Sequence, residues 1–136
     1  MKVQPYLFFD GSCDEAIAFY KNSLGAEVVT VMLYKDSPEP EMCSPATADK
    51  VMHASLRFGD TEVMMSDGRC EGKRNFQGFS LTLTVMDIPE AERLFGILAE
   101  GGEVQMPMTE TFWSPRFGMV ADRFGMSWMV MVQGPY

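Results

Sequence analysis

The stretch DEAIAFYKNSLGAEV (residues 14–28) places apolar side chains at helical spacing and ends in a glycine that precedes a β-branched run. The stretch PEAERLFGILAEGGEV (89–104) repeats this order of features in the second half of the chain. FGDTEVMM (58–65) and FGMSWMVM (124–131) form a second pair of related stretches. Together the two pairs indicate an internal duplication.

Each half of the chain reads as one strand, one helix and three further strands. The elements expected in the first half are a strand at 4–9, a helix at 13–25, a strand at 26–34 and a hairpin at 51–67 that turns at Gly59-Asp60. Those expected in the second half are a strand at 79–85, a helix at 86–102, a strand at 103–108 and a hairpin at 112–132 that turns at Asp122–Gly125. Ser12 or Asp14 is expected to cap the first helix and Gly25 to end it.

This order of elements predicts an α+β fold of two βαβββ modules that form a cup-shaped mixed sheet. The modules are expected at about residues 1–70 and 77–136, joined by the polar, glycine-rich stretch 68–78. A chain of 136 residues is the size of one domain, so we expect both modules to belong to a single domain.

The composition argues against some classes of partner and compartment. The formal net charge of −8 disfavours binding to nucleic acid or to an anionic membrane surface. The chain has no apolar run of the roughly 18 residues that span a bilayer, and its first residues do not read as a secretory signal. Cys13, Cys43 and Cys70 are widely spaced and form no CxxC pair. We therefore expect reduced thiols in a cytoplasmic protein.

Alternation along the expected strands separates an apolar face from a more polar one. Hydroxyl groups, an imidazole, a guanidinium and aromatic rings share the more polar face, on which we place Gln4, Tyr6, Phe8, His53, Ser55, Arg57, Ser80, Thr82 and Thr84. Such a mixture can line a cup for a small molecule. The alternative is a polar sheet face that meets only solvent, which antiparallel sheets commonly have.

The paired βαβββ pattern resembles the vicinal oxygen chelate superfamily, which includes glyoxalase I, fosfomycin and bleomycin resistance proteins and extradiol dioxygenases. The resemblance rests on FDGSCDEAIAFYKNSLGAEV (9–28), HASLRFGDTEVMMSD (53–67) and TFWSPRFGMVADRFGMSW (111–128) and covers nearly the whole chain. The last stretch is more specific for the PhnB-like branch, whose domain carries the description "3-demethylubiquinone-9 3-methyltransferase". Methyl transfer does not fit the element order, because no glycine-rich turn joins a strand to a helix in a βαβ arrangement.

The metal-using members of the superfamily carry ligands on the first and last strands of each module. The resemblance places Gln4 and Ser80 at the first-strand positions, and Val63 or Met65, together with Met129, at the last-strand positions. None of these is the histidine or carboxylate that Zn²⁺, Mn²⁺ or Fe²⁺ prefers, and the chain's single histidine is elsewhere. We therefore predict no metal and no cofactor, and we interpret the methionines as an adaptable apolar pocket floor.

Three functions stay open on this reading. The first is metal-independent binding of a small molecule in the cup, with Trp113 at its rim available to contact a ligand or a partner subunit. The second is a lyase or isomerase for a small oxygenated metabolite, with His53 as candidate base, Arg57 as an anion clamp and Tyr6 assisting. The third is a dimeric interaction module whose cup holds no ligand. The resemblance implies a homodimer, and residues 35–50 are a candidate lid.

Overall fold

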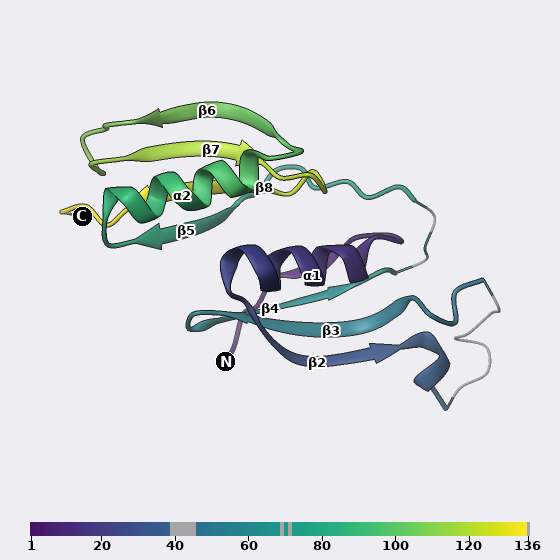
Figure 1. Cartoon of the computed structure of the whole chain (residues 1–136). Helices are drawn as coiled ribbons and strands as arrows, with labels where there is room; N and C mark the ends of the chain where they lie inside the picture. Colours follow the sequence, from purple (N-terminus) through teal and green to yellow (C-terminus); the bar gives the residue numbers. More distant parts are fainter. Residues whose placement is uncertain (39–45, 69, 71, 136) are drawn as a thin grey trace. The chain divides into compact units, whose positions relative to one another are not determined.

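The computed structural model describes residues 1–38, 46–68, 70 and 72–135 (Figure 1). It contains two compact units, Met1–Arg74 and Asn75–Tyr136. The boundary between them falls inside the polar stretch 68–78 that the sequence predicted as a connection. Within the described ranges, neither helix has the length and apolar character needed to cross a membrane.

Unit 1 is built from one helix and a four-stranded mixed sheet. Its elements in chain order are β1 (Tyr6–Phe8), α1 (Cys13–Leu24), β2 (Glu27–Leu33), the 3₁₀ turn η1 (Tyr34–Asp36), β3 (Val51–Phe58) and β4 (Thr61–Ser66). The strands lie in the order β1-β4-β3-β2, with β1 parallel to β4 and the other pairs antiparallel.

Unit 2 repeats this plan. Its elements are β5 (Leu81–Val85), α2 (Ile88–Ala99), β6 (Glu103–Thr109), β7 (Phe117–Ala121) and β8 (Ser127–Val132). The strand order β5-β8-β7-β6, with β5 parallel to β8, matches unit 1 strand for strand. The duplication and the α+β class predicted from the sequence are therefore confirmed.

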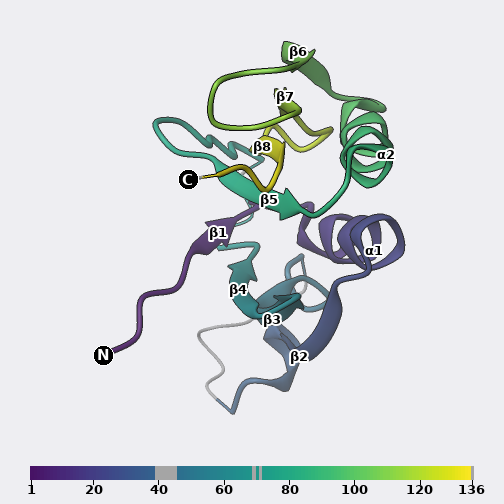
Figure 2. The same ribbon diagram turned by 90° about the vertical axis from the view of Figure 1, so that its left-hand side faces the viewer.

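In each unit the helix covers one face of the sheet, as the two views show (Figures 1 and 2). The covered face carries the apolar half of each alternating strand. Its buried side chains in unit 1 include Leu7, Phe9, Ala54, Leu56, Val63 and Met65, and in unit 2 Val120, Trp128, Val130 and Val132. Helix residues such as Ala16, Tyr20, Ala91 and Leu98 close these cores from above.

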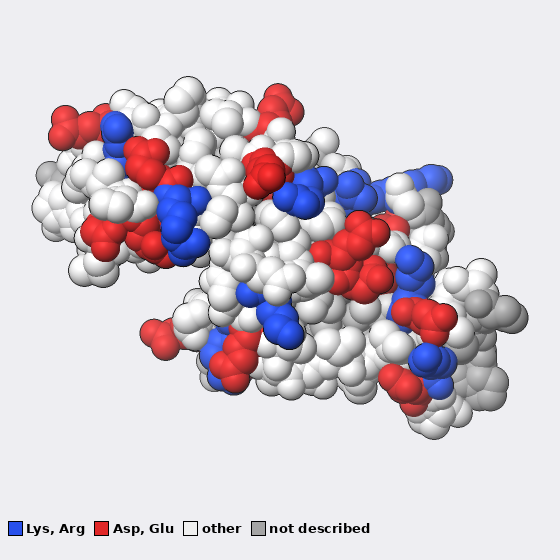
Figure 3. Space-filling model, viewed as in Figure 1, with Lys and Arg blue, Asp and Glu red and all other residues white. Residues whose placement is uncertain are grey.

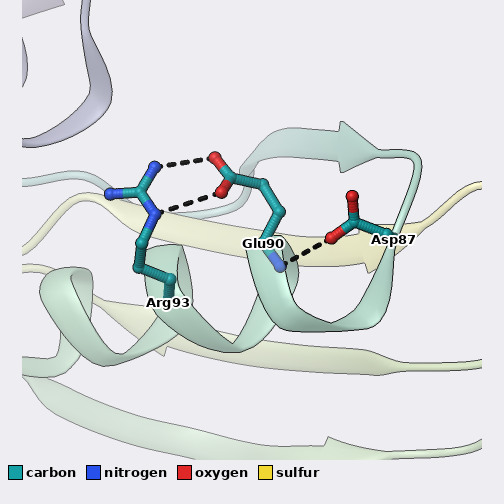
Figure 4. Close-up of polar contacts among 3 residues, drawn as sticks. All are labelled: Asp87, Glu90 and Arg93. Carbon is teal, nitrogen blue, oxygen red and sulfur yellow. Dashed lines mark hydrogen bonds and ion pairs between the residues drawn. The ribbon is translucent and has the colours of Figure 1, made fainter.

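Local signals set the ends of the helices. Gly25 ends α1 in the left-handed conformation, with φ of 70°, and its N–H donates to the carbonyl of Tyr20, as a C-terminal cap requires. Asp87 begins α2, because its carboxylate accepts the backbone N–H of Glu90 at 2.8 Å (Figure 4). Glu90 in turn pairs with Arg93 at 2.7 Å, and this hydrogen bond lowers the pKa of the Glu90 carboxyl.

The start of α1 depends on a residue from the far end of the unit. Ser12 occupies the cap position, one of the two predicted, but its hydroxyl donates to the carbonyl of Phe9 and makes no side-chain cap bond to the helix. The carboxylate of Asp67, which is fully buried, accepts the N–H groups of Gly11 and Cys13 through Oδ1, each at 2.8 Å. Its Oδ2 accepts the N–H of Val51, also at 2.8 Å.

Replacing Asp67 by asparagine should lower the stability of the protein by about 3 kcal/mol. The amide can accept on one side only, and its NH₂ group would face a buried backbone N–H of Gly11, Cys13 or Val51. Urea unfolding measures the loss. Asp60→Asn, in the exposed turn between β3 and β4, is the matched control and should change stability by no more than about 0.5 kcal/mol. Equal effects of the two substitutions would contradict the role given to Asp67.

Candidate functional site

The face of each sheet opposite its helix is called here the open face of that unit. In unit 1, Tyr6, Met64, Ser55 and Thr30 stand in one cross-strand row on this face. All the unit 1 residues that the sequence assigned to the more polar face lie on this side, namely Gln4, Tyr6, Phe8, His53, Ser55 and Arg57. On the strands they alternate with Leu7 of β1 and with Ala54 and Leu56 of β3, although Ser55 is itself buried.

Three rings gather at one side of this open face and are called here the aromatic corner: Tyr6, Phe8 and His53. The Oη of Tyr6 lies 2.9 Å from Nδ1 of His53. The Tyr6 ring centroid is 5.0 Å from that of Phe8 and 5.6 Å from that of His53. Tyr6 and Phe8 remain 37% and 55% exposed, so their rings offer contact surface that unit 1 itself does not cover.

Two other predicted polar residues of unit 1, Ser55 and Arg57, bond to carboxylates. The Ser55 hydroxyl donates to Glu62 at 2.5 Å, and Arg57 pairs with Glu27 of β2 at 3.1 Å. His53 and Arg57 stand four residues apart on β3, a separation of roughly 13 Å along a strand. The structure therefore brings His53 together with Tyr6 and not with Arg57.

Glu62 is a residue that the sequence analysis missed. Val63 and Met65 were the candidates for the open face of β4, but both are buried beneath α1, and Glu62 and Met64 take the open side. The signal was present, because a two-residue turn at Gly59-Asp60 pairs Phe58 with Thr61 and so Leu56 with Val63.

A polar groove of about 270 Å³ lies at the Arg57 end of β3. Its lining residues are Lys2, Val3, Gln4, Arg57, Asp60, Thr61 and Glu62. Both signs of charge meet there, and the amide of Gln4 reaches the carbonyl of Glu62 at 3.5 Å. Across the viewed surface, basic and acidic side chains likewise stand beside one another rather than in one large patch of a single sign (Figure 3). The groove therefore presents charges of both signs and does not favour a purely cationic or a purely anionic ligand.

The open face of unit 2 carries a line of thioethers. Met106, Met119 and Met129 are cross-strand neighbours on β6, β7 and β8, and Thr82 of β5 continues the row. We call these three residues the methionine row. The next row contains Met131 beside Phe117. Each of the three thioether side chains is half-buried.

The remaining predicted residues border this face. Ser80 bonds to the hydroxyl of Ser127 at 2.9 Å, and Thr82 is exposed. The Trp113 ring is half-buried and packs edge-on against Phe117, with centroids 5.3 Å apart. Trp128 points to the covered side instead, where its indole donates to Asp122 at 2.9 Å.

Asp122 also organises the turn between β7 and β8. Its carboxylate accepts the N–H groups of Phe124 and Met126, and its carbonyl accepts that of Gly125. The turn predicted at Asp122–Gly125 is confirmed. The predicted lid at 35–50 begins in η1, where Tyr34 and Lys35 bond to the carbonyls of Lys50 and Ala48. Its middle, 39–45, lies outside the described residues.

The side chains present do not suit the divalent ion of the superfamily. The ligand positions hold Gln4, Ser80 and Met129, and the carboxylate of Glu62 on β4 is already bonded to Ser55. An amide, a hydroxyl and a thioether are not the donors that such ions prefer. Among the residues that the structure describes, no three His, Cys, Asp or Glu side chains converge.

Comparison with known proteins identifies the family. The family model described as "3-demethylubiquinone-9 3-methyltransferase" matches residues 1–131. The chain belongs to this PhnB-like family. The Escherichia coli (strain K12) protein YjdN is 38% identical over 142 residues, which cover 97% of this chain and 95% of the relative.

Solved structures agree with this assignment. Protein PA1353 from Pseudomonas aeruginosa is 43% identical, with a TM-score of 0.87 and 98% of each chain covered. A PhnB protein from Bacillus cereus is 27% identical, with a TM-score of 0.81 and coverage of 97% of this chain and 99% of that one.

The glyoxalase-like fold extends beyond these relatives. A glyoxalase/bleomycin resistance protein/dioxygenase family enzyme from Burkholderia phytofirmans PsJN shares the fold at 13% identity and a TM-score of 0.62, over 96% of this chain and 94% of that one. The superfamily resemblance is thereby confirmed at the level of fold.

Partial burial, the largest cause, raises the pKa of the Tyr6 phenol above its ordinary value of about 10. The stability that neutral Tyr6 contributes is therefore complete below about pH 10 and is lost as the pH rises through the higher folded pKa. Tyr6→Phe should make the loss of stability above pH 10 shallower and remove one late-ionising phenol from an ultraviolet titration. Tyr34→Phe is the comparison, since burial also raises the pKa of Tyr34. A Tyr6 phenol that ionises below its ordinary value would contradict this environment.

Proposed function

We propose that this protein binds a small, largely apolar molecule on the open faces of its sheets without a metal. The observation that carries the proposal is the aromatic corner of unit 1, where the exposed Tyr6 ring stands between the His53 imidazole and the exposed Phe8 ring. Exposure of aromatic surface to water costs free energy, and a ligand that covers this surface recovers that free energy. A few polar groups beside apolar surface are the usual composition of a small-molecule site.

The methionine row supports the same conclusion for unit 2. Thioether side chains are flexible and polarisable, so they adapt to the outline of an apolar ligand and make favourable contacts with aromatic rings. Thr82 and Ser80 border the row and supply hydroxyl groups at its edge.

An enzyme is the second candidate, favoured by the hydrogen bond between Tyr6 and His53. A tyrosine that holds an imidazole by one nitrogen leaves the other available for proton transfer. Arg57 does not strengthen this case, because Glu27 already neutralises its guanidinium. His53→Ala should abolish turnover in a lyase or isomerase, whereas a binding protein should lose at most about tenfold in affinity, ~1.4 kcal/mol.

A homodimer is the third proposal, and it concerns assembly rather than chemistry. β2 is an edge strand whose Val29, Val31 and Met32 are exposed, and a second copy of the chain could cover them.

Native mass spectrometry and elemental analysis of untagged protein address the metal, the ligand and the assembly together. We expect a dimer mass, no stoichiometric metal, and a discrete small molecule that dissociates on activation. One metal ion per chain would contradict metal-independent binding. A monomer mass would contradict the dimer and leave the binding proposal to the experiment below.

Binding to the aromatic corner can be measured with N-phenyl-1-naphthylamine, an uncharged fluorescent dye, in the presence of EDTA. Phe8→Ala should weaken binding of this dye at least tenfold, about 1.4 kcal/mol, because it removes the most exposed ring of the corner. Phe112→Ala is the matched control, since Phe112 is 81% exposed in unit 2 and lies outside both open-face rows. Equal losses in the two variants, or dye binding that requires added Zn²⁺ or Mn²⁺, would contradict the proposal.

A further inference from the structure

The bond between Tyr6 and His53 fixes which nitrogen of the imidazole carries the proton. The Tyr6 Oη lies 2.9 Å from Nδ1, within normal hydrogen-bond distance. Between a neutral phenol and a neutral imidazole, the phenol is the better donor and the unprotonated ring nitrogen the better acceptor. Because burial raises the pKa of Tyr6, the phenol keeps its proton at neutral pH. Nδ1 is then the acceptor, and the proton of the ring resides on Nε2.

Within the described residues, no hydrogen bond joins the His53 imidazole to the neighbouring hydroxyl groups. Ser55 donates to Glu62 at 2.5 Å, and Ser66 donates to the carbonyl of Val51 at 3.4 Å and lies within hydrogen-bond reach of the Tyr6 phenol. Within the described part of the chain, the hydrogen bond of His53 is the one to Tyr6. His53 is half-buried on the open face, and its imidazole stands beside the Tyr6 ring, which in turn stands beside the Phe8 ring.

The charge of the chain favours a neutral acceptor over an anionic one. At the Arg57 end of β3, Glu27, Asp60 and Glu62 offset Arg57 and Lys2, and the chain as a whole carries a net charge of −8. A carboxylate would approach against this field, whereas a carbonyl oxygen carries no net charge and accepts the same bond.

We infer that the open face of unit 1 recognises an aromatic ketone, aldehyde or amide, whose carbonyl oxygen accepts the Nε2–H of His53 while its ring packs against Phe8 and Tyr6. Tyr6 is a positioning residue in this scheme, because it acts by holding the tautomer of His53. This inference rests on the proposed function and names the chemical class of its ligand.

The tautomer is measured directly by nitrogen-15 spectra, which are simple here because His53 is the only histidine in the sequence. At a pH where the imidazole is neutral, Nε2 should give a pyrrole-type signal and Nδ1 a pyridine-type signal. Tyr6→Phe should yield a mixture of the two tautomers without loss of the fold, which a merely structural role of Tyr6 would not produce. A pyrrole-type Nδ1 in the unchanged protein would overturn the inference.

The ligand class is tested with acetophenone and ethylbenzene, which differ by one carbonyl oxygen. The dissociation constant of ethylbenzene divided by that of acetophenone should be about fivefold to tenfold larger in the unchanged protein than in His53→Leu. The difference corresponds to the one hydrogen bond that His53→Leu removes. His53→Gln should retain most of the ratio, because its amide offers an N–H donor and an oxygen acceptor in similar places.

The outcomes separate this inference from the proposed function. If both molecules bind and the ratio is unchanged in His53→Leu, the carbonyl inference is wrong and the binding surface stands. If neither molecule binds the unchanged protein but the dye binds in a Phe8-dependent manner, the ligand class is wrong. If neither the molecules nor the dye bind, the proposed function itself fails.

Discussion

Three backbone N–H groups that converge on the buried carboxylate of Asp67 hold unit 1 together. This one side chain joins the turn before α1, the first residue of α1 and the first residue of β3. A buried carboxylate is tolerable only when such donors surround it, so the arrangement is cooperative: each segment is fixed by the others. Because β1 leads directly into the same turn, Asp67 also sets where Tyr6 and Phe8 stand on the open face.

Unit 2 also contains a buried aspartate that accepts several N–H groups, but at a different place in the fold. Its buried aspartate, Asp122, accepts two backbone N–H groups and the indole of Trp128, and so fixes the turn between β7 and β8. The start of α2 needs no distant residue, because Asp87 caps it locally. The two units therefore share strand order but not the interactions that stabilise it. Both leave one sheet face uncovered by their own helix, and the positions that the superfamily resemblance assigned to metal ligands there hold the amide of Gln4, the hydroxyl of Ser80 and the thioether of Met129.

The sequence predicted features that depend on local patterns. Periodicity and turn chemistry predict the duplicated order of elements, the end of the first helix at Gly25 and the turn at Asp122. The alternation of side chains placed Tyr6, Phe8 and His53 on one face. The features it missed join distant residues. Asp67 lies 54 positions from Cys13, and the Tyr6–His53 bond spans 47 positions and exists only because β4 lies between β1 and β3. The pairing of Arg57 with Glu27 likewise depends on the register of β2 against β3, which is interrupted by bulges.

The central claim is that a small molecule binds to the open face without a metal. The methyl signals of two adjacent methionines, Met64 and Met65, test this claim most directly. Met64 is the cross-strand neighbour of Tyr6 on the open face of unit 1, whereas Met65 is fully buried on the covered face. Carbon-13 spectra of labelled methionine methyl groups, recorded in EDTA while acetophenone is added, report on both faces at once. The account predicts a saturable shift of the Met64 methyl signal and an unchanged Met65 signal. Shifts of equal size at both positions, or a Met64 shift that appears only after a divalent metal is supplied, would contradict it.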